Sequence, residues 1–552
     1  MQVIRDARAK LNLADTIDTS AYNSFTELLI EGCKKNGSAP AFTALGHTMT
    51  FSELDESSDN LASYLQNEAG LVAGDRVALQ LPNMLQYPVA LLGVLKAGMV
   101  VVNTNPLYSV REMVHQFNDS GAKALIILAN VAADTAKALP DTGIEKVIVT
   151  EAADLHPTLK RVLINFVAKY VKKLIPKFEI ANTISLREAL SLGSKKAHTP
   201  GSAKFEDVAM LQYTGGTTGL SKGAMLTHGN LVSNLMQFMT MTESYGFTDG
   251  GEVNILPLPL YHIYACILAA MGIHRGDHGV LIPNPRDMDG FVKTLGEHKF
   301  STFAGLNTLF VGLCAHDEFK KLDFSSLKVT FSGGMALTNA AAGRWLEVTG
   351  CDIYEGYGMT ETSPLVSSAP ANGNKRGTIG LPVAGTEIKI VDDEGNALGV
   401  DQPGELCVRG PQVMLGYWNR PDATAETIDS DGWLYTGDVA QVGEDGYMRI
   451  VDRKKNMIIV SGFNVFPNEV EDILCNHEDV LEAAVIGVPD ETAGEAIQAF
   501  IVPAKADVDF DVLRAYCKEN LAGYKVPRAF ELRDDLPKSA VGKILHRELR
   551  ED

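Results

Sequence analysis

The sequence lacks the cysteine pattern of a disulfide framework or of a structural zinc site. Its 7 cysteines are scattered over 552 residues, with no C-x-x-C pair and no Cys/His cluster, whereas both kinds of site need clustered ligands. They are Cys33, Cys266, Cys314, Cys351, Cys407, Cys475 and Cys517. We therefore expect reduced, mostly buried thiols in a cytosolic protein.

The sequence also lacks a segment that would carry it into or across a membrane. The opening string MQVIRDARAKLNLADTIDTS has no apolar core of the kind that a signal peptide needs. The final residues, ELRED, match no peroxisomal or retention signal. The longest apolar stretch near the front, residues 87–103, is broken by Lys96 and two glycines, and a spanning helix needs roughly 20 apolar residues. We therefore expect a cytoplasmic protein.

Positive charge is scarce. The chain has 49 Lys and Arg against 69 Asp and Glu, and its formal net charge is −20. This balance repels phosphate backbones and argues against a nucleic-acid partner. The hydrophobic share of 45% is ordinary for a globular chain and excludes a wholly disordered one.

One segment departs from the overall acidity. Residues 160–178 contain six basic residues and no acid, and apolar pairs recur every four residues between Val162 and Ile175. This pattern predicts an amphipathic helix. Two interpretations stay open: a helix that packs on its own domain, or an interfacial helix on anionic lipid at the inner face of the cell membrane.

The first half of the chain alternates strand-like and helical patterns. Residues 74–81 predict a strand, residues 84–98 a helix and residues 99–103 the next strand. Ser109 and Glu112 predict a capping box before another helix, and residues 124–128 a further buried strand. Strand, helix and strand at this spacing predict βαβ layers, and so an α/β fold with a largely parallel sheet.

The pattern of predicted secondary structure changes toward the C-terminus. Short strands and turns between about residues 375 and 450 predict a small β-rich subdomain. After Asp452 a segment of about 100 residues follows, which is long enough for a small domain of its own. The predicted domains are therefore residues 1–452, which include the β-rich subdomain, and residues 453–552.

A glycine- and threonine-rich segment, residues 213–223, carries the clearest chemical signal. Glycines let backbone N–H groups approach an anion, threonine hydroxyls bind phosphate oxygens or Mg²⁺, and a lysine adds positive charge. The segment follows a predicted strand but does not match the G-x-x-x-x-G-K-[ST] phosphate loop. The residues that we expect to contact ATP here are Tyr213, Thr214, Gly215, Gly216, Thr217, Thr218, Gly219 and Lys222.

The string YTGGTTGLSKGAMLTHGN resembles the signature of the acyl-adenylate-forming superfamily, which includes acyl-CoA synthetases, firefly luciferase and peptide-synthetase adenylation domains. Four more motifs resemble those of the family in the family's order: the adenine and Mg²⁺ motif at 356–361, the ribose motif at 435–438, the hinge at 452–455 and the catalytic-lysine motif at 537–543. The resemblance covers roughly residues 20–550. DGWLYTGDVAQVGEDGYMRIVDRKKN and PLPLYHIYA are similar to bacterial long-chain fatty-acyl-CoA synthetases.

The resemblance implies a two-step reaction. A carboxylate attacks the α-phosphate of ATP and expels pyrophosphate, and the thiol of coenzyme A then displaces AMP from the acyl-AMP. By resemblance, Lys543 meets the developing charge in the first step, and Glu361 holds Mg²⁺ together with Thr214 or Thr217. The implied catalytic residues are Lys543, Glu361 and Thr214.

The resemblance also assigns residues to the nucleotide. Tyr357 is similar to the residue that stacks on adenine. Asp438 would accept hydrogen bonds from the ribose hydroxyls, because an ionised carboxylate is an acceptor only. The remaining implied contacts to ATP are Gly334, Gly356, Gly358, Thr360 and Arg453.

Further roles follow from the resemblance alone. Asp452 would be the hinge about which a small, mobile α+β C-terminal domain turns after adenylation. Ser461 and Gly462 would face the pantetheine arm of coenzyme A, and Tyr261 and His262 would line the acyl pocket. No acid lies between residues 254 and 270, which disfavours an amino-acid substrate.

The leading interpretation is an ATP-dependent synthetase for medium- to long-chain fatty acids. Within the same family, an aryl-CoA ligase or an acyl-AMP ligase that loads a carrier protein stays open. A non-catalytic acyl- or membrane-binding scaffold is the alternative of another class, and the presence of Lys543, Glu361 and Asp438 argues against it. Homodimers are frequent in the family, but the sequence fixes neither the oligomeric state nor the chain length of the acyl group.

Overall fold

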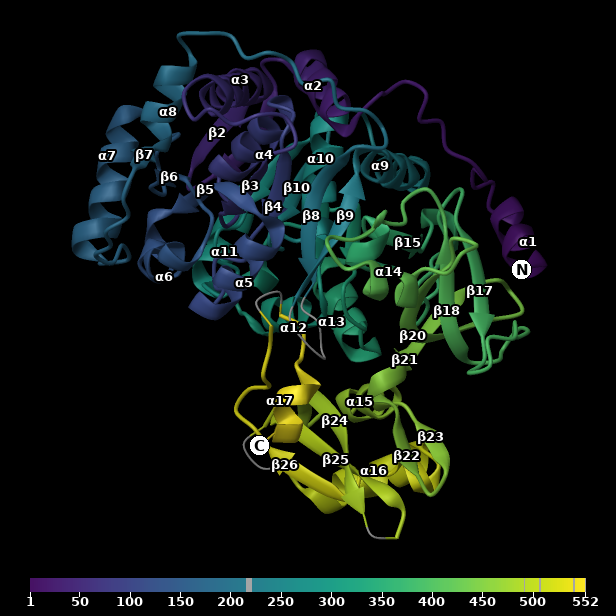
Figure 1. Cartoon of the computed structure of the whole chain (residues 1–552). Helices are drawn as coiled ribbons and strands as arrows, with labels where there is room; N and C mark the ends of the chain where they lie inside the picture. Colours follow the sequence, from purple (N-terminus) through teal and green to yellow (C-terminus); the bar gives the residue numbers. More distant parts are fainter. Residues whose placement is uncertain (215–220, 491, 506–507, 540–541, 552) are drawn as a thin grey trace.

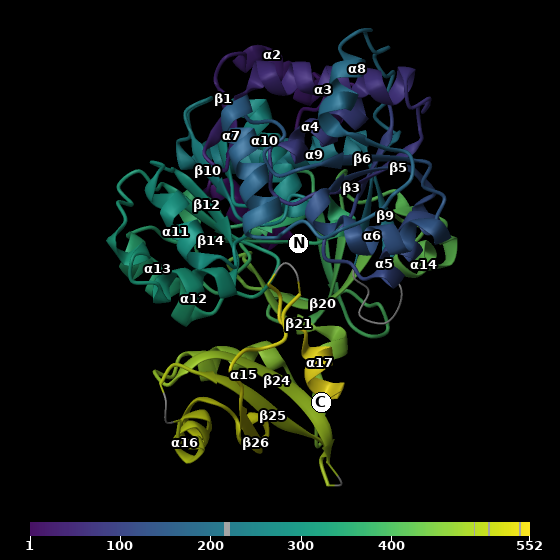
Figure 2. The same cartoon turned by 90° about the vertical axis from the view of Figure 1, so that its left-hand side faces the viewer.

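The computed structural model describes residues 1–214, 221–490, 492–505, 508–539 and 542–551. The chain forms a large part and, below it in Figure 1 and Figure 2, a smaller C-terminal part. The main buried apolar cluster runs from Phe25 to Tyr417, and a separate one lies within Ile458–Leu521. Two separate cores confirm the predicted α/β fold with a large N-terminal and a small C-terminal unit.

The first sheet of the large part has the order β19-β9-β8-β4-β3-β5-β6-β7. In this order, all neighbouring strands from β8 through to β7 are parallel. Strands β9 and β19 are antiparallel to their neighbours and lie at one edge. The strands are β3 (Arg76–Gln80), β4 (Val100–Asn103), β5 (Ala122–Leu128), β6 (Lys146–Thr150), β7 (Thr183–Ser185), β8 (Val208–Thr214), β9 (Lys222–Thr227) and β19 (Gly416–Tyr417).

The second sheet has the order β16-β15-β14-β13-β12-β10-β11-β1-β2, with parallel pairing from β14 to β1. Its strands are β1 (Pro40–Ala44), β2 (His47–Thr50), β10 (Val253–Leu256), β11 (His278–Leu281), β12 (Thr302–Gly305), β13 (Val329–Ser332), β14 (Ile353–Gly358), β15 (Leu365–Ser368) and β16 (Leu381–Pro382).

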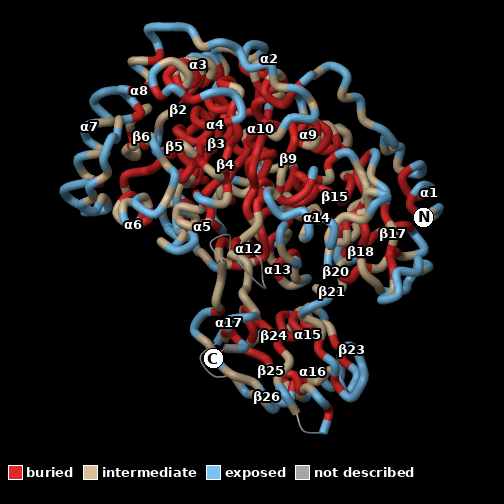
Figure 3. The backbone as a smooth tube through the Cα atoms, in the orientation of Figure 1, coloured by how far each residue is buried: buried red, intermediate tan, exposed pale blue. Residues whose placement is uncertain are grey.

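Helices cover and separate these two sheets (Figure 3). They are α1 (Gln2–Lys10), α2 (Phe25–Asn36), α3 (Phe51–Asn67), α4 (Gln86–Lys96), α5 (Val110–Ser120), α6 (Ala132–Ala138), α7 (Thr158–Phe166), α8 (Leu186–Gly193), α9 (His228–Thr242), α10 (Ile263–Arg275), α11 (Met288–Gly296), α12 (Asn307–Ala315), α13 (Asn339–Thr349) and α14 (Pro421–Thr427). No described helix combines the length and the apolarity that crossing a membrane requires.

The predicted βαβ unit is confirmed as β3, α4 and β4. Every residue of α4 is buried, which explains its nearly continuous apolar sequence. Its one cation, Lys96, is tolerated because Nζ lies 2.5 Å from Asp55 Oδ1 and 2.6 Å from Asp59 Oδ1. The predicted capping box is also present: the backbone N–H of Ser109 donates to Glu112 at 2.8 Å.

The β-rich subdomain is an antiparallel sheet of order β17-β18-β20-β21 at the right of Figure 1. Its strands are β17 (Glu387–Val391), β18 (Gly404–Arg409), β20 (Leu434–Val442) and β21 (Met448–Arg453). Because β21 runs up to Arg453, the last strand of the large part ends where the sequence predicts the domain boundary.

The C-terminal part is built on a sheet of order β23-β22-β25-β24, with β26 beside β25. Its strands are β22 (Ile458–Val460), β23 (Phe463–Val465), β24 (Val480–Asp490), β25 (Gly494–Pro503) and β26 (Ala529–Leu532), and its helices are α15 (Pro467–Cys475), α16 (Phe510–Asn520) and α17 (His546–Glu551). Strand β23 lies at the opposite edge of the sheet from β24, against which α17 packs.

The helix predicted over residues 160–178 is shorter in the structure. Helix α7 continues into a π-helical turn at Val167–Val171 and stops there. Lys173 takes a left-handed backbone conformation with φ +51, and Pro176 cannot continue a helix. The prediction of a helix is therefore wrong for residues 172–178.

Candidate active site

A cavity opens at the carboxyl ends of the parallel strands of the second sheet, where ligands commonly bind in α/β folds. Its wall includes Phe238 of α9, His262 before α10 and the segment Ser332–Gly334 after β13. Residues Gly356–Met359 of and after β14 close another side. The adenine motif predicted from the sequence therefore lines this cavity.

Two of its glycines cannot be replaced without a change in the backbone. Gly334 has φ +89, a conformation that other residues rarely adopt. A Cβ atom on Gly358 would lie 2.0 Å from the carbonyl oxygen of Pro364. Gly358 therefore allows β14 to pack closely against Pro364. Gly334 allows the backbone to turn in the cavity wall after β13.

A hydrogen-bonded group joins this cavity to the β-rich subdomain. The hydroxyl of Tyr357 donates to Asp438 Oδ2 at 2.5 Å, and Arg453 Nε lies 3.2 Å from Asp438 Oδ1. Asp438 and Arg453 face each other across the β20–β21 pair. Since both carboxylate oxygens of the buried Asp438 are held, its position is fixed before any ribose arrives.

Glu361 is the buried carboxylate of the site. It lies in the single helical turn Thr360–Thr362 after β14 and is 7% exposed. Burial raises the pKa of Glu361, and the hydroxyl of Tyr417, which donates to Oε1 at 2.7 Å, opposes that rise. One carboxylate oxygen is thus held by Tyr417.

The oxygen donors present suit Mg²⁺. Among the described residues no group of three or more His, Cys, Asp or Glu side chains forms a complete metal cage. Mg²⁺ does not require one, because it is usually held by one or two carboxylates together with substrate phosphates and water. Glu361 and the hydroxyl of Thr214 are residues of this kind.

Tyr417 was not singled out by the sequence analysis. It lies in β19, 56 residues beyond its partner Glu361, and it also packs against Lys222, whose Nζ is 5.2 Å from the ring centroid. No sequence signal marks it, because the contact arises only from the antiparallel pairing of β19 with β9. Tyr417 therefore orients Glu361 and supports the base of the phosphate loop.

Removing the hydroxyl of Tyr417 tests this role. Tyr417→Phe leaves Glu361 without its donor, and a lost hydrogen bond to a charged group costs about 1.5–3 kcal/mol. We expect the Mg²⁺ concentration needed for half-maximal acyl-AMP formation to rise about tenfold. Tyr447→Phe, which removes a hydroxyl that donates to the Gly373 carbonyl, is the matched control. An unchanged Mg²⁺ dependence in Tyr417→Phe would contradict the assignment.

The phosphate loop is described only at its base. Thr214 ends β8 and pairs with Lys222, which starts β9. The buried side chain of Tyr213 donates to Asp119 Oδ2 at 2.7 Å. Its side chain thus joins β8 to α5. The other predicted loop residues, which are Gly215, Gly216, Thr217, Thr218 and Gly219, lie outside the described residues.

Lys543 reaches this site from the C-terminal part. The segment before α17 extends up to the large part in Figures 1 and 2, where Thr308 Oγ1 of α12 donates to the Gly542 carbonyl at 3.2 Å. Burial and the positive charge of Arg453 lower the pKa of Lys543 to about 8, while the charge of Asp438 opposes this. Thr308 and Gly542, which are 234 positions apart in the sequence, are thereby brought together.

His262 lines the cavity and lies close to Lys543. Burial, and then the charge of Lys543, lower the pKa of His262 to about 4, so its ring is neutral at pH 7. Its Nδ1 accepts the backbone N–H of Tyr264 at 3.4 Å. Tyr261 is not among the described residues that line the cavity. Its backbone carbonyl accepts a hydrogen bond from the side chain of Gln212 at 2.7 Å.

The predicted hinge joins the two parts. The buried carboxylate of Asp452 accepts the backbone N–H of Arg453 at 2.6 Å and that of Asn468 at 2.9 Å, and burial raises its pKa to about 6. Ser461 and Gly462, with φ +52 and +82, form the exposed β22–β23 turn. This turn is at the edge of the sheet opposite β24 and α17, so it does not face the cavity in this conformation.

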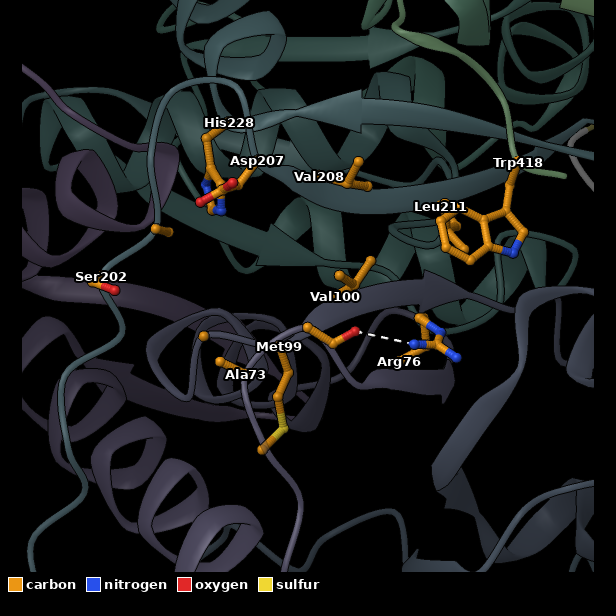
Figure 4. A pocket seen from close by; sticks show the side chains of 13 residues that line it. Ala73, Arg76, Met99, Val100, Ser202, Asp207, Val208, Leu211, His228 and Trp418 are labelled. Carbon is orange, nitrogen blue, oxygen red and sulfur yellow. Dashed lines mark hydrogen bonds between the residues drawn. The ribbon is translucent and has the colours of Figure 1, made fainter. Parts of the chain in front are cut away.

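A larger cavity of about 340 Å³ lies beside β4 and β8 (Figure 4). Arg76 at one end uses its donors on the carbonyls of Gly74, Ser120 and Gly121. At the other end burial lowers the pKa of His228 to about 4. None of the described residues that line it is a site residue predicted from the sequence, whereas Gly334, Gly356, Tyr357, Gly358 and His262 line the cavity beside β14.

The fold and this site define an adenylate-forming enzyme. Residues 29–418 match the family model described as AMP-binding enzyme, and residues 469–543 match that of the AMP-binding enzyme C-terminal domain. The chain therefore belongs to the AMP-binding enzyme family, which confirms the resemblance seen in the sequence.

Curated relatives match over nearly the whole chain. A long-chain-fatty-acid–CoA ligase of Salmonella typhimurium is 49% identical over 540 residues, which cover 97% of this chain and 96% of that protein. One of Bacillus subtilis is 38% identical, with 93% and 91% covered. Among solved structures, an anthranilate CoA ligase in complex with anthranoyl-AMP aligns with a TM-score of 0.85 at 25% identity and covers 96% of this chain and 97% of that chain.

Proposed function

We propose that this enzyme ligates a long- or medium-chain fatty acid to coenzyme A, through an acyl-AMP intermediate, with release of pyrophosphate and AMP. The observation that carries the proposal is that Lys543 lies beside Arg453 and Asp438 and close to His262, which lines the cavity. The names of the relatives that are 47–49% identical support the choice of a fatty acid.

In the first step a carboxylate oxygen of the fatty acid forms a bond to the α-phosphorus of ATP, and the bond to pyrophosphate breaks. Lys543, a cation at pH 7, stabilises the negative charge that gathers between these two anions. Mg²⁺, held by Glu361 and by Thr214 or Thr217, supplies further charge neutralisation when bound. Asp438 and Arg453 bind the ribose, and Tyr357 with Gly334, Gly356, Gly358 and Thr360 encloses the adenine.

In the second step the thiol of coenzyme A attacks the acyl carbon, and the bond to AMP breaks. We propose that the C-terminal domain, residues 453–552, turns about Asp452 to withdraw Lys543 and to bring Ser461 and Gly462 to the cavity. Such a turn needs only a few residues at the end of an element to change φ and ψ. The open turn at Gly462 leaves room for the pantetheine arm.

The acyl group lies on the His262 side of the cavity, whereas Gly356–Gly358 enclose the adenine on another side. No carboxylate is found among the described residues of its wall, so an α-amino group would find no counter-ion there. A feruloyl-CoA synthase of Amycolatopsis is 34% identical, and the aromatic acid that its name implies is the second candidate class of substrate.

A panel of carboxylates tests the proposal. Pyrophosphate release with octanoate, palmitate, ferulate and phenylalanine, each with and without coenzyme A, separates the alternatives. We expect release with the two fatty acids, and repeated turnover only when coenzyme A is present. Faster release with ferulate would place the enzyme among aryl-CoA ligases, whereas turnover that needs a carrier protein would make it a loading ligase.

Two further parts of the proposal concern the location of the enzyme in the cell and its oligomeric state. We propose a cytoplasmic enzyme that associates with the inner face of the cell membrane through residues 160–178, and whose described cysteines are all buried and unpaired. We also propose a homodimer as its assembly, which size-exclusion chromatography with light scattering tests directly.

A further inference from the structure

The most exposed apolar surface of the molecule lies on α7 and the π-helical turn after it. Of the 17 large hydrophobic side chains that are exposed among the described residues, seven fall between positions 159 and 174. They are Leu159, Val162, Leu163, Phe166, Tyr170, Val171 and Leu174. Leu159 is 87% exposed, and the others are between 51% and 64% exposed. A contiguous exposed patch of this kind is the mark of an interaction site.

This surface does not pack on its own domain. In α7 no residue is buried, and in the following turn only Ala168 is. The segment is instead fastened by polar contacts: Asn165 accepts the backbone N–H of Ala153 at 2.9 Å, and Lys160 Nζ donates to the Gly46 carbonyl at 2.9 Å. Polar contacts thus attach the segment to its domain while most of α7 is exposed, as its mainly pale blue colour in Figure 3 shows.

The same segment concentrates positive charge in an acidic protein. Six cations and no anion lie within residues 160–178, whereas the chain as a whole carries −20. Among the described residues, Lys169 is the one cation of this segment with an ion pair, since its Nζ lies 3.9 Å from Glu151 Oε1. These cations are Lys160, Arg161, Lys169, Lys172, Lys173 and Lys177. Their charge selects an anionic partner.

We propose that residues 159–174 are an interfacial anchor that lies parallel to an anionic lipid bilayer. The seven apolar side chains enter the boundary between headgroups and acyl chains, and the lysines contact lipid phosphates. A second copy of the chain fits poorly, because an isologous contact would place two sets of six cations against each other. This proposal names the surface that the membrane association proposed above requires.

The position of the anchor suits the catalytic cycle. Helix α7 lies at the left margin of Figure 1 and faces the viewer in Figure 2, whereas the C-terminal part hangs below the large part and behind the plane of α7. A bilayer against α7 therefore leaves the C-terminal part in water, free to turn about Asp452. The enzyme is held where its proposed substrate is concentrated without hindering the movement of Lys543.

Vesicle flotation with matched variants tests the anchor. The probes are phosphatidylcholine vesicles with and without phosphatidylglycerol. The triple change of Lys169, Lys172 and Lys173 to Glu removes three cations, each worth about 1 kcal/mol near an anionic surface, so we expect its partition coefficient to fall by about a hundred-fold. Leu163→Ser with Phe166→Ser removes two large apolar groups, and we expect a similar fall. The control changes three exposed lysines elsewhere, Lys34, Lys299 and Lys518, to Glu.

Each outcome decides the matter. Binding to anionic vesicles that falls in both patch variants, but not in the control, supports the anchor. Equal flotation of all four proteins, or no flotation of the wild type, overturns it. A change in oligomeric state of the patch variants without vesicles overturns it in favour of a second copy. Turnover of water-soluble octanoate, which we expect to be unchanged in these variants, separates this result from any failure of the proposed catalysis.

Discussion

Lys543→Ala lowers the rate of acyl-AMP formation by about 10²–10³-fold, the loss that follows the removal of a single group that stabilises transition-state charge. Lys543 is the cation that the C-terminal part delivers to Asp438 and His262, and alanine leaves the developing charge on the α-phosphate uncompensated. Thioester formation from supplied acyl-AMP should be unaffected, because we propose that Lys543 is withdrawn in that step. Quenched-flow measurement of pyrophosphate release and of thioester formation separates the two.

The pH dependence provides the control for this variant. Because the pKa of Lys543 is about 8, the ammonium form is lost as the pH rises through 8, and wild-type acyl-AMP formation should fall in that range. The fall should be absent from Lys543→Ala and present in Lys518→Ala, which removes an exposed lysine of α16. A similar loss in both half-reactions, or the same pH profile in all three proteins, is incompatible with the role given to Lys543.

Gly462→Leu should have the opposite effect. We expect acyl-AMP formation at the wild-type rate and CoA-dependent turnover reduced on the order of 100-fold, since a misplaced nucleophile loses about that much. Gly462 has φ +82 and open space around it in this conformation, so the leucine side chain is accommodated until the C-terminal part turns toward the cavity. In the turned position, the leucine side chain would block the approach of the coenzyme A thiol.

Gly395→Leu is the matched control for backbone strain. Gly395 lies in an exposed turn of the β-rich subdomain with φ +84 and likewise no atom within 4 Å of an added Cβ. Both variants therefore carry the same left-handed strain of about 1–2 kcal/mol. Unchanged CoA turnover in Gly462→Leu, or an equal loss in Gly395→Leu, would remove Gly462 from the path of coenzyme A.

The parts of the fold that local sequence determines could be predicted. The capping box of Ser109 and Glu112 needs two residues three positions apart, and the β3–α4–β4 unit follows from a change in hydrophobic periodicity. The family motifs likewise indicated some residues that line the cavity, such as Gly334, Gly356 and Tyr357. Local sequence patterns could not predict how the two parts are separated in space. They also could not predict the edge of the C-terminal sheet at which Gly462 lies.

The contacts that the sequence did not reveal depend on tertiary pairing. Tyr417 reaches Glu361 only because β19 pairs with β9, and the two residues belong to unrelated motifs. Tyr213 lies inside the loop signature, yet the alternation along β8 turns its ring toward Asp119. The apolar period from Val162 to Ile175 predicted a longer helix, but the left-handed turn at Lys173 ends it.

Oxygen transfer tests the central claim, which is that the acyl group passes through acyl-AMP. Palmitate labelled with ¹⁸O in its carboxylate is incubated with ATP and coenzyme A, and the AMP is analysed by mass spectrometry. Because a carboxylate oxygen bonds to the α-phosphorus and stays there when the thiol displaces AMP, the account predicts one ¹⁸O atom in each AMP released. AMP without label, or label in inorganic phosphate or pyrophosphate, would contradict it.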